Sequence, residues 1–216
     1  MSRISFRLAV TALGVFLIAL GGCVNLGEGT KQSPRFYVLD SPFTPRVQKK
    51  VYEDKECLAI GLGPVNLPQY LNRPQIVTRV SPNELKADEF HRWAEPLKDN
   101  VARVLRMNLS NLLCIKSLTP FPWRAVKPID YRIEVDVIRM DGNLGGDVEL
   151  IARWSIHAEN EKGIVVSKEN AYRESVKPRS YEGLVSAHSK TLAALSLDMA
   201  EALKDLSSKG GRVSSP

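Results

Sequence analysis

The chain has 216 residues, of which 44% are hydrophobic, and its formal net charge is +6. This length and composition suffice to bury one full core, and they indicate a single domain. The charge falls to +4 when Arg3 and Arg7 are discounted with the N-terminal segment described next. So mild a bias argues against a nucleic-acid-binding surface, and we expect no nucleic-acid partner.

The first 22 residues divide into the three regions of an export signal. Arg3 and Arg7 give a positively charged start, residues 8–20 are apolar and uncharged, and Gly21 and Gly22 precede Cys23. The apolar run is shorter than the roughly 20 residues that span a bilayer, but it suits a signal peptide. We therefore expect a signal peptide over residues 1–22, cleaved between Gly22 and Cys23. The alternative is an ordinary secretory signal with an incidental cysteine.

The run Leu20-Gly21-Gly22-Cys23 resembles the lipobox of bacterial lipoproteins. That resemblance implies a diacylglycerol on the Cys23 thiol, and two or three acyl chains together anchor a protein stably. Residue 24 is Val and not the Asp that retains lipoproteins in the inner membrane of enteric-type bacteria. The expected location is thus the periplasmic face of the outer membrane of a Gram-negative bacterium. Residues 23–35 read as a polar, lipidated tether that reaches at most about 40 Å.

Hydrophobic periodicity predicts one α+β domain over residues 36–206. Short or alternating apolar runs predict strands, and apolar residues at helical spacing predict two long helices. The expected strands are 36–39, 57–65, a hairpin over 76–91, and a meander over 131–137, 148–156 and 164–174; the helices are 96–113 and 181–206. We expect an antiparallel sheet with both helices packed on one face, followed by a disordered tail over 207–216.

Besides Cys23, only Cys57 and Cys114 are cysteines. The first stands at the start of an expected core strand and the second near the end of the first long helix. In an oxidising periplasm the two could form a disulfide, if the helix lies across the sheet. The alternative is that they are two separate buried hydrophobic residues.

Residues 61–113 carry a specific resemblance. The runs GLGPVNLPQYLNRPQIVTRVSPNEL (61–85) and FHRWAEPLKDNVARVLRMNLSNLL (90–113) resemble the signature of the PqiC family, the ABC-type transport auxiliary lipoprotein component. The early strand 36–39 and the closing meander and helix fit the family as well. The resemblance therefore covers essentially the whole chain after Cys23.

This resemblance implies a non-enzymatic periplasmic subunit of an MCE/Pqi-type or ABC-type envelope transport system. The implied partners are an MCE-domain protein and inner-membrane transporter subunits, and the implied cargo is phospholipid or another hydrophobic compound. A homo-oligomeric ring would match the symmetry of a tube-shaped partner. A lipoprotein chaperone or assembly factor for outer-membrane components is the alternative, and it shares every feature except the signature at 61–113.

The segment 67–74 is a candidate partner interface. Pro68 and Pro74 disfavour both helix and strand, so the segment should form a stiff loop. A stiff loop presents side chains at little entropic cost, and the candidate contact residues are Leu67, Tyr70, Leu71 and Arg73. The alternative is that the apolar side chains pack beneath the domain as a satellite of the core. Trp93 is expected to fill the core.

The sequence gives no support for an enzyme, a cofactor or a metal site. The three histidines, His91, His157 and His188, form no HExxH or His-x-His spacing, and the chain has neither a GxSxG elbow nor a GxxxxGK[ST] loop. His188 lies on an apolar helical stripe, as a core or boundary histidine would. Glu134 and Asp136 share a strand face, which alternating strand polarity explains.

Overall fold

The computed structural model describes residues 33–43, 57–123, 128–159 and 163–210. Residues 1–32, which include the expected signal peptide and Cys23, lie outside the described residues. The chain from Pro34 onward forms one compact unit. None of the helices in the described ranges is long and apolar enough to cross a membrane.

The larger of two sheets has five strands in the order β5-β2-β6-β7-β8. The strands are β2 (Leu58–Asn66), β5 (Ile115–Pro120), β6 (Tyr131–Gly142), β7 (Asp147–Ala158) and β8 (Ile164–Ser175). Strands β6, β7 and β8 form an antiparallel meander, while β2 pairs in parallel with both β5 and β6. The alternating apolar residues of β7 explain its place, because every second side chain from Val148 to Ile156 is buried.

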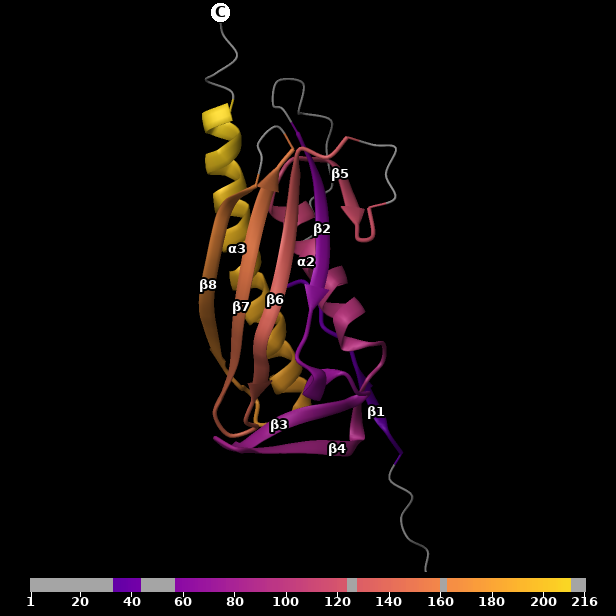
Figure 1. The fold of residues 1–216 in the computed structure, drawn as a ribbon. Coiled ribbons are helices and arrows are strands. Elements are labelled where there is room, and N and C mark those ends of the chain that lie inside the picture. The colour runs from indigo at the N-terminus through magenta and orange to yellow at the C-terminus, as the bar shows by residue number, and fades with distance from the viewer. Residues whose placement is uncertain (1–32, 44–56, 124–127, 160–162, 211–216) are drawn as a thin grey trace, which may run out of the picture. The chain divides into compact units, whose positions relative to one another are not determined.

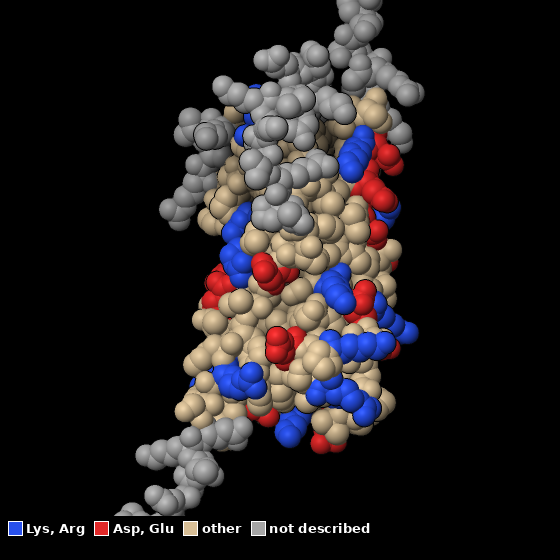
Figure 2. All heavy atoms as spheres, turned by 180° about the vertical axis from the view of Figure 1, so that it is seen from behind, with Lys and Arg blue, Asp and Glu red and all other residues tan. Residues whose placement is uncertain are grey.

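Helices α2 (Leu97–Leu112) and α3 (Tyr181–Gly210) cover one face of this sheet (Figure 1). Helix α3 contacts β7 and β8, and α2 contacts β2 and α3. The buried residues of α2 include Leu97, Val101, Val104, Leu105 and Leu109, which recur at helical spacing and so form the apolar stripe that packs on the sheet. Seen from behind, charged side chains of both signs are scattered among uncharged areas (Figure 2).

The smaller sheet has three strands in the order β1-β4-β3 and lies across one end of the large sheet (Figure 1). Strands β3 (Gln75–Ser81) and β4 (Glu84–Trp93) form an antiparallel hairpin, and β1 (Arg35–Tyr37) runs parallel to β4. A short 3-10 helix, η1 (Gln69–Leu71), connects β2 to β3. Just after β1, Leu39 is completely buried, so the N-terminal strand is fixed to the domain.

The α+β class, the two long helices, the hairpin and the meander confirm the predictions from sequence. The large sheet is mixed where we expected antiparallel pairing, because β2 lies in parallel between β5 and β6. Strand β5 was not foreseen. Helix α3 continues to Gly210, so residues 207–210 are helical and not part of a disordered tail, whereas residues 211–216 lie outside the described residues.

Cys57 and Cys114 are joined by a disulfide with a Cα–Cα distance of 4.7 Å. This distance lies within the roughly 4.4–6.8 Å that a disulfide spans. The two cysteines directly precede β2 and β5, and the Leu58 N–H donates to the Cys114 carbonyl at 3.0 Å. The bond therefore ties together the starts of two neighbouring parallel strands.

Candidate functional site

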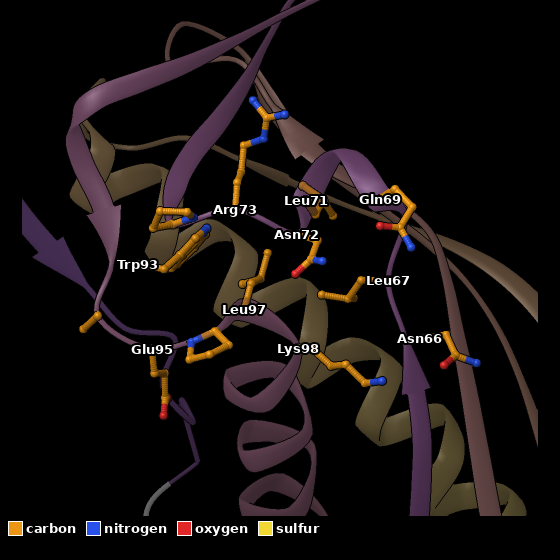
Figure 3. A pocket seen from close by; sticks show the side chains of 13 residues that line it. Asn66, Leu67, Gln69, Leu71, Asn72, Arg73, Trp93, Glu95, Leu97 and Lys98 are labelled. Carbon is orange, nitrogen blue, oxygen red and sulfur yellow. The ribbon is translucent and has the colours of Figure 1, made fainter.

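A groove of about 720 Å³ lies where the end of β2, the segment that follows it and the start of α2 meet (Figure 3). Its walls come from two separate stretches of the chain. The lining residues are Asn66, Leu67, Gln69, Leu71, Asn72, Arg73 and Pro74 on one side and Trp93, Ala94, Glu95, Pro96, Leu97 and Lys98 on the other. Both stretches belong to the segment 61–113 that carries the family resemblance.

Backbone hydrogen bonds hold the first wall in a defined shape. Leu71 N–H donates to the Pro68 carbonyl and Asn72 N–H to the Gln69 carbonyl, each at 3.0 Å, which closes the η1 turn. The Trp93 N–H then donates to the Pro74 carbonyl at 2.7 Å and ties the end of this segment to β4. The segment between the two prolines is therefore hydrogen-bonded at both ends, and it contains the 3-10 helix η1 where the sequence predicted a loop without helix or strand.

The four candidate interface residues occupy different environments. Leu71 is only 4% exposed and belongs to the hydrophobic core, as the core alternative expected, and the small exposed part lines the groove. Leu67 is half-buried and packs against that core, yet it also lines the groove. Arg73 is exposed on the rim. Tyr70 is half-buried and does not line the groove.

The Tyr70 hydroxyl is held by a buried carboxylate. It donates to Oδ2 of Asp141 at 2.8 Å, and Arg79 donates to both oxygens of Asp141 at 2.6 and 2.8 Å. Arg139 adds a third cationic contact at 3.0 Å. Asp141 lies at the end of β6, so this cluster fastens η1 and β3 to the large sheet.

The same contacts control the protonation of the cluster. Burial alone would raise the pKa of Asp141, but hydrogen bonds from Arg79, Tyr70 and Arg139 outweigh it and lower that pKa below its ordinary value. Burial, followed by the hydrogen bond to Asp141, raises the pKa of Tyr70 to about 12. Asp141 is therefore charged and Tyr70 neutral at neutral pH, which preserves the contact.

The second wall combines a buried aromatic ring with an ion-paired carboxylate. Trp93 is 6% exposed, which confirms its expected place in the core, and the exposed remainder lines the groove. Glu95 accepts hydrogen bonds from Arg103 at 2.9 Å and from the side-chain amide of Asn100. Helix α2 begins directly after it with Leu97, whose buried side chain completes the apolar floor.

Sequence reasoning named Arg73 but missed Lys98, the second cation on the groove. Lys98 and Arg73 both line it and are exposed, and neither forms an ion pair with any residue in the described ranges. The signal for Lys98 was its place in the first turn of a helix whose apolar face was already assigned. In the close view Lys98 extends past Leu97 toward the end of β2 (Figure 3).

The chemistry of the groove is that of binding. Its lining contains no histidine and no cysteine, and the described residues hold no cluster of three or more potential metal ligands. His188 is 2% exposed inside the core, and His91 lies outside the groove, where it contacts Asp88 at 2.8 Å and stacks on Tyr181. The groove thus offers apolar contact, hydrogen bonding and positive charge.

Comparison with known proteins places this fold in a family. A family model described as ABC-type transport auxiliary lipoprotein component matches residues 37–200. None of the curated proteins matches the chain.

Two solved structures share the fold. Protein XCC0632 from Xanthomonas campestris, of the family DUF330, superposes with a TM-score of 0.60 at 15% identity, covering 84% of this chain and 98% of that one. The crystal structure of an uncharacterized protein superposes with a TM-score of 0.61 at 17% identity, covering 79% of this chain and 99% of that one. At such identities the likeness shows the fold alone, and the family rests on the sequence match. Because that match spans both walls of the groove and most of the domain, the chain belongs to the ABC-type transport auxiliary lipoprotein component family, a family of transport subunits and not of enzymes.

Proposed function

We propose that this chain is a lipid-anchored subunit of an envelope transport system, held on the periplasmic face of the outer membrane through Cys23. Its groove contacts an MCE-domain protein or another subunit of an ABC-type transporter whose remaining subunits lie in the inner membrane. The observation that carries the proposal is the groove itself, because the family match includes both of its walls. The cargo of such a system is phospholipid or another hydrophobic compound.

The groove has the properties of a protein-binding surface. A tryptophan and three leucines line it, together with an exposed arginine and an exposed lysine. Aromatic and Arg side chains dominate the binding energy of many interfaces. Because the first wall is hydrogen-bonded at both ends, little conformational entropy is lost when a partner docks.

The tether places the groove within reach of a membrane. Arg35 starts β1, and the twelve residues 24–35 reach at most about 40 Å when fully extended. A lipid on Cys23 would thus keep the domain close to the membrane while leaving the groove free for a partner that arrives across the periplasm. A ring of several such subunits around a tube-shaped partner would satisfy the symmetry of the tube.

Co-purification tests the proposal. The tagged full-length chain is extracted from native membranes in mild detergent, and the subunits and lipids that elute with it are identified. We expect an MCE-domain protein or the permease and ATPase of an ABC transporter. Recovery of barrel-assembly components in their place would overturn the proposal in favour of a chaperone or assembly factor.

The anchor has its own test. Cys23→Ser should leave the domain folded but abolish acylation and membrane retention, because the thiol is the proposed site of the lipid. Intact-mass measurement of the native mature protein checks this directly, since each acyl chain adds a defined mass. A native N-terminus without lipid would exclude the anchor, whatever subunits co-elute.

A further inference from the structure

The groove does not end at Lys98. A second hollow of about 330 Å³ shares Lys98 with it and continues along the same side of α2, past Ala102 to Arg106. Its opposite wall is formed by β2 around Pro64 and by Phe121, just beyond the end of β5. The two hollows adjoin at Lys98 and both lie between β2 and α2, and we name them together the β2–α2 channel.

Strand β5 runs beside only the first part of β2, and the channel lies beside the remaining part. Strand β5 pairs with β2 from Leu58 to Leu62 and ends at Pro120. Along Gly63–Asn66, none of the described strands pairs with β2 on that side. An extended segment in line with β5 would therefore find an open strand edge, and open edges bind extended peptides readily.

Gly63 leaves room for the turn at Phe121, where the chain after β5 leaves the edge of β2. It has a φ of 121°, and a Cβ added there would lie 2.6 Å from the Cβ of Phe121. A side chain at residue 63 would therefore collide with the turn in which the chain leaves the sheet after β5. Pro64 has no N–H to donate, and neighbouring residues of a strand direct their backbone groups to opposite edges, so at most one of Val65 and Asn66 can pair along this edge. Most of the binding energy must then come from side chains.

The charges along the channel are predominantly positive. Arg73, Lys98 and Arg106 line it, and none of the three forms an ion pair or a side-chain hydrogen bond with any described residue. Of the two acidic residues in its walls, Glu95 is already engaged by Arg103, which leaves only Asp99. Cations without partners beside an apolar floor favour a ligand that carries both carboxylates and apolar groups.

We infer that the β2–α2 channel binds an extended, acidic peptide segment of a partner subunit. This inference rests on the proposed function and specifies the partner's chemistry. An apolar side chain of the peptide segment packs between Leu67, Trp93 and Leu97. Acidic side chains of the same segment form ion pairs with Lys98 and Arg106. A phospholipid fits less well, because roughly half of the residues that line the larger hollow are polar or charged, whereas acyl chains need a hydrocarbon lining.

A displayed random-peptide library provides the probe. It is selected against the full lipidated chain reconstituted in nanodiscs of zwitterionic lipid. We expect the selected peptides to combine Asp or Glu with a large apolar residue, and to bind more weakly as salt is raised. Their affinity should fall about tenfold or more for Lys98→Glu combined with Arg106→Glu. Hydrogen exchange should slow at whichever of the Val65 and Asn66 amides faces away from β6 when the peptide binds.

Lys190→Glu is the matched control. It reverses the charge of an exposed lysine on α3 that lines neither hollow, and it should leave peptide affinity unchanged. Melting temperatures of all variants confirm that the domain remains folded. Selected peptides without an acidic preference, or peptides that bind the double variant as tightly as the parent, would overturn the inference.

Two further outcomes separate this inference from the proposed function. If transporter subunits co-purify equally well with the parent and with the Lys98→Glu, Arg106→Glu variant, the channel assignment fails and the transport function stands. The second outcome is that phosphatidylglycerol vesicles bind the parent domain but not the double variant, and that acidic peptides bind neither protein. In that case the channel is a lipid site and the inference is wrong.

Discussion

The buried histidine of α3 predicts how the stability of the domain depends on pH. His188 is 2% exposed, and its Nδ1 is buried without a hydrogen-bond partner in the described structure. Burial lowers the pKa of His188 from 6.5 to about 4, because the charged imidazolium loses its hydration. Asp141 opposes this shift only weakly. The native protein therefore keeps His188 neutral at pH values where the unfolded chain would protonate it.

The sign and size of the effect follow from linkage. Between pH 6.5 and 4 the unfolded chain binds a proton at this residue and the native state does not, so the free energy of unfolding falls as the pH is lowered. From pH 7 to pH 5 the loss is about 2 kcal/mol, and it reaches roughly 3 kcal/mol below the native pKa. For a domain of this size a loss of about 2 kcal/mol lowers the melting temperature by roughly 4–8 °C.

Urea unfolding at pH 7, 6 and 5 tests this prediction in the parent and in His188→Met. The variant keeps an apolar side chain of adaptable shape at this site but cannot titrate, so its loss of stability from pH 7 to pH 5 should be smaller by about 2 kcal/mol. Leu192→Met is the control, because it changes a buried side chain of the same helix without removing a titratable group and should leave the slope unchanged. Parallel pH profiles of parent and His188→Met would refute the reasoning.

Three further substitutions test the construction of the groove and the disulfide by denaturant unfolding. Tyr70→Phe removes the hydrogen bond to the buried Asp141 carboxylate and should lower the free energy of unfolding by about 1.5–3 kcal/mol. A decrease below roughly 0.5 kcal/mol would show that this bond does not hold the segment 67–74. Leu71→Ala should cost about 2–5 kcal/mol as a core truncation, whereas an interface residue would leave the stability nearly unchanged. Replacing Cys57 and Cys114 together by Ser should lower the free energy of unfolding by about 4 kcal/mol, because the disulfide closes a loop with a sequence separation of 57. A double variant as stable as the oxidised parent would contradict this prediction.

The elements that could be predicted from sequence are those with a strong local period. Apolar residues recur at helical spacing over the sixteen residues of α2, and apolar and polar residues largely alternate over the twelve residues of β7. Each pattern therefore predicts both the type of element and the face that is buried. Strand β5 has neither signal. Its six residues are mostly half-buried without a clear alternation, and they follow the end of α2 almost directly.

Strand pairing was harder to foresee, because it depends on residues far apart in the chain. The continuous apolar run of β2 predicted a buried core strand, yet nothing local indicated β5 and β6 as its parallel neighbours. The same limit applied to the groove. Proline spacing predicted a stiff segment, but the partner of Tyr70 is Asp141, 71 residues away, so only the fold shows that this side chain points inward.

The hydrogen bonds around Leu39 connect the N-terminal strand to the groove. Leu39 donates its N–H to Oδ1 of Asn100 at 2.9 Å, and Arg103 donates to the Leu39 carbonyl at 3.1 Å. The same two side chains, Asn100 and Arg103, bind Glu95, which lines the groove. Leu39 itself is completely buried, so the segment that follows β1 cannot shift without breaking this network.

This shared framework bears on how an anchored subunit would work. If Cys23 carries the proposed lipid, the twelve residues 24–35 would set the reach of the anchor, which is at most about 40 Å. The hydrogen-bonded residues Leu39, Asn100, Arg103 and Glu95 fix the distance between the segment after β1 and the wall that the proposed partner would contact. A partner bound in the groove would therefore be held at a defined place relative to the N-terminal strand β1.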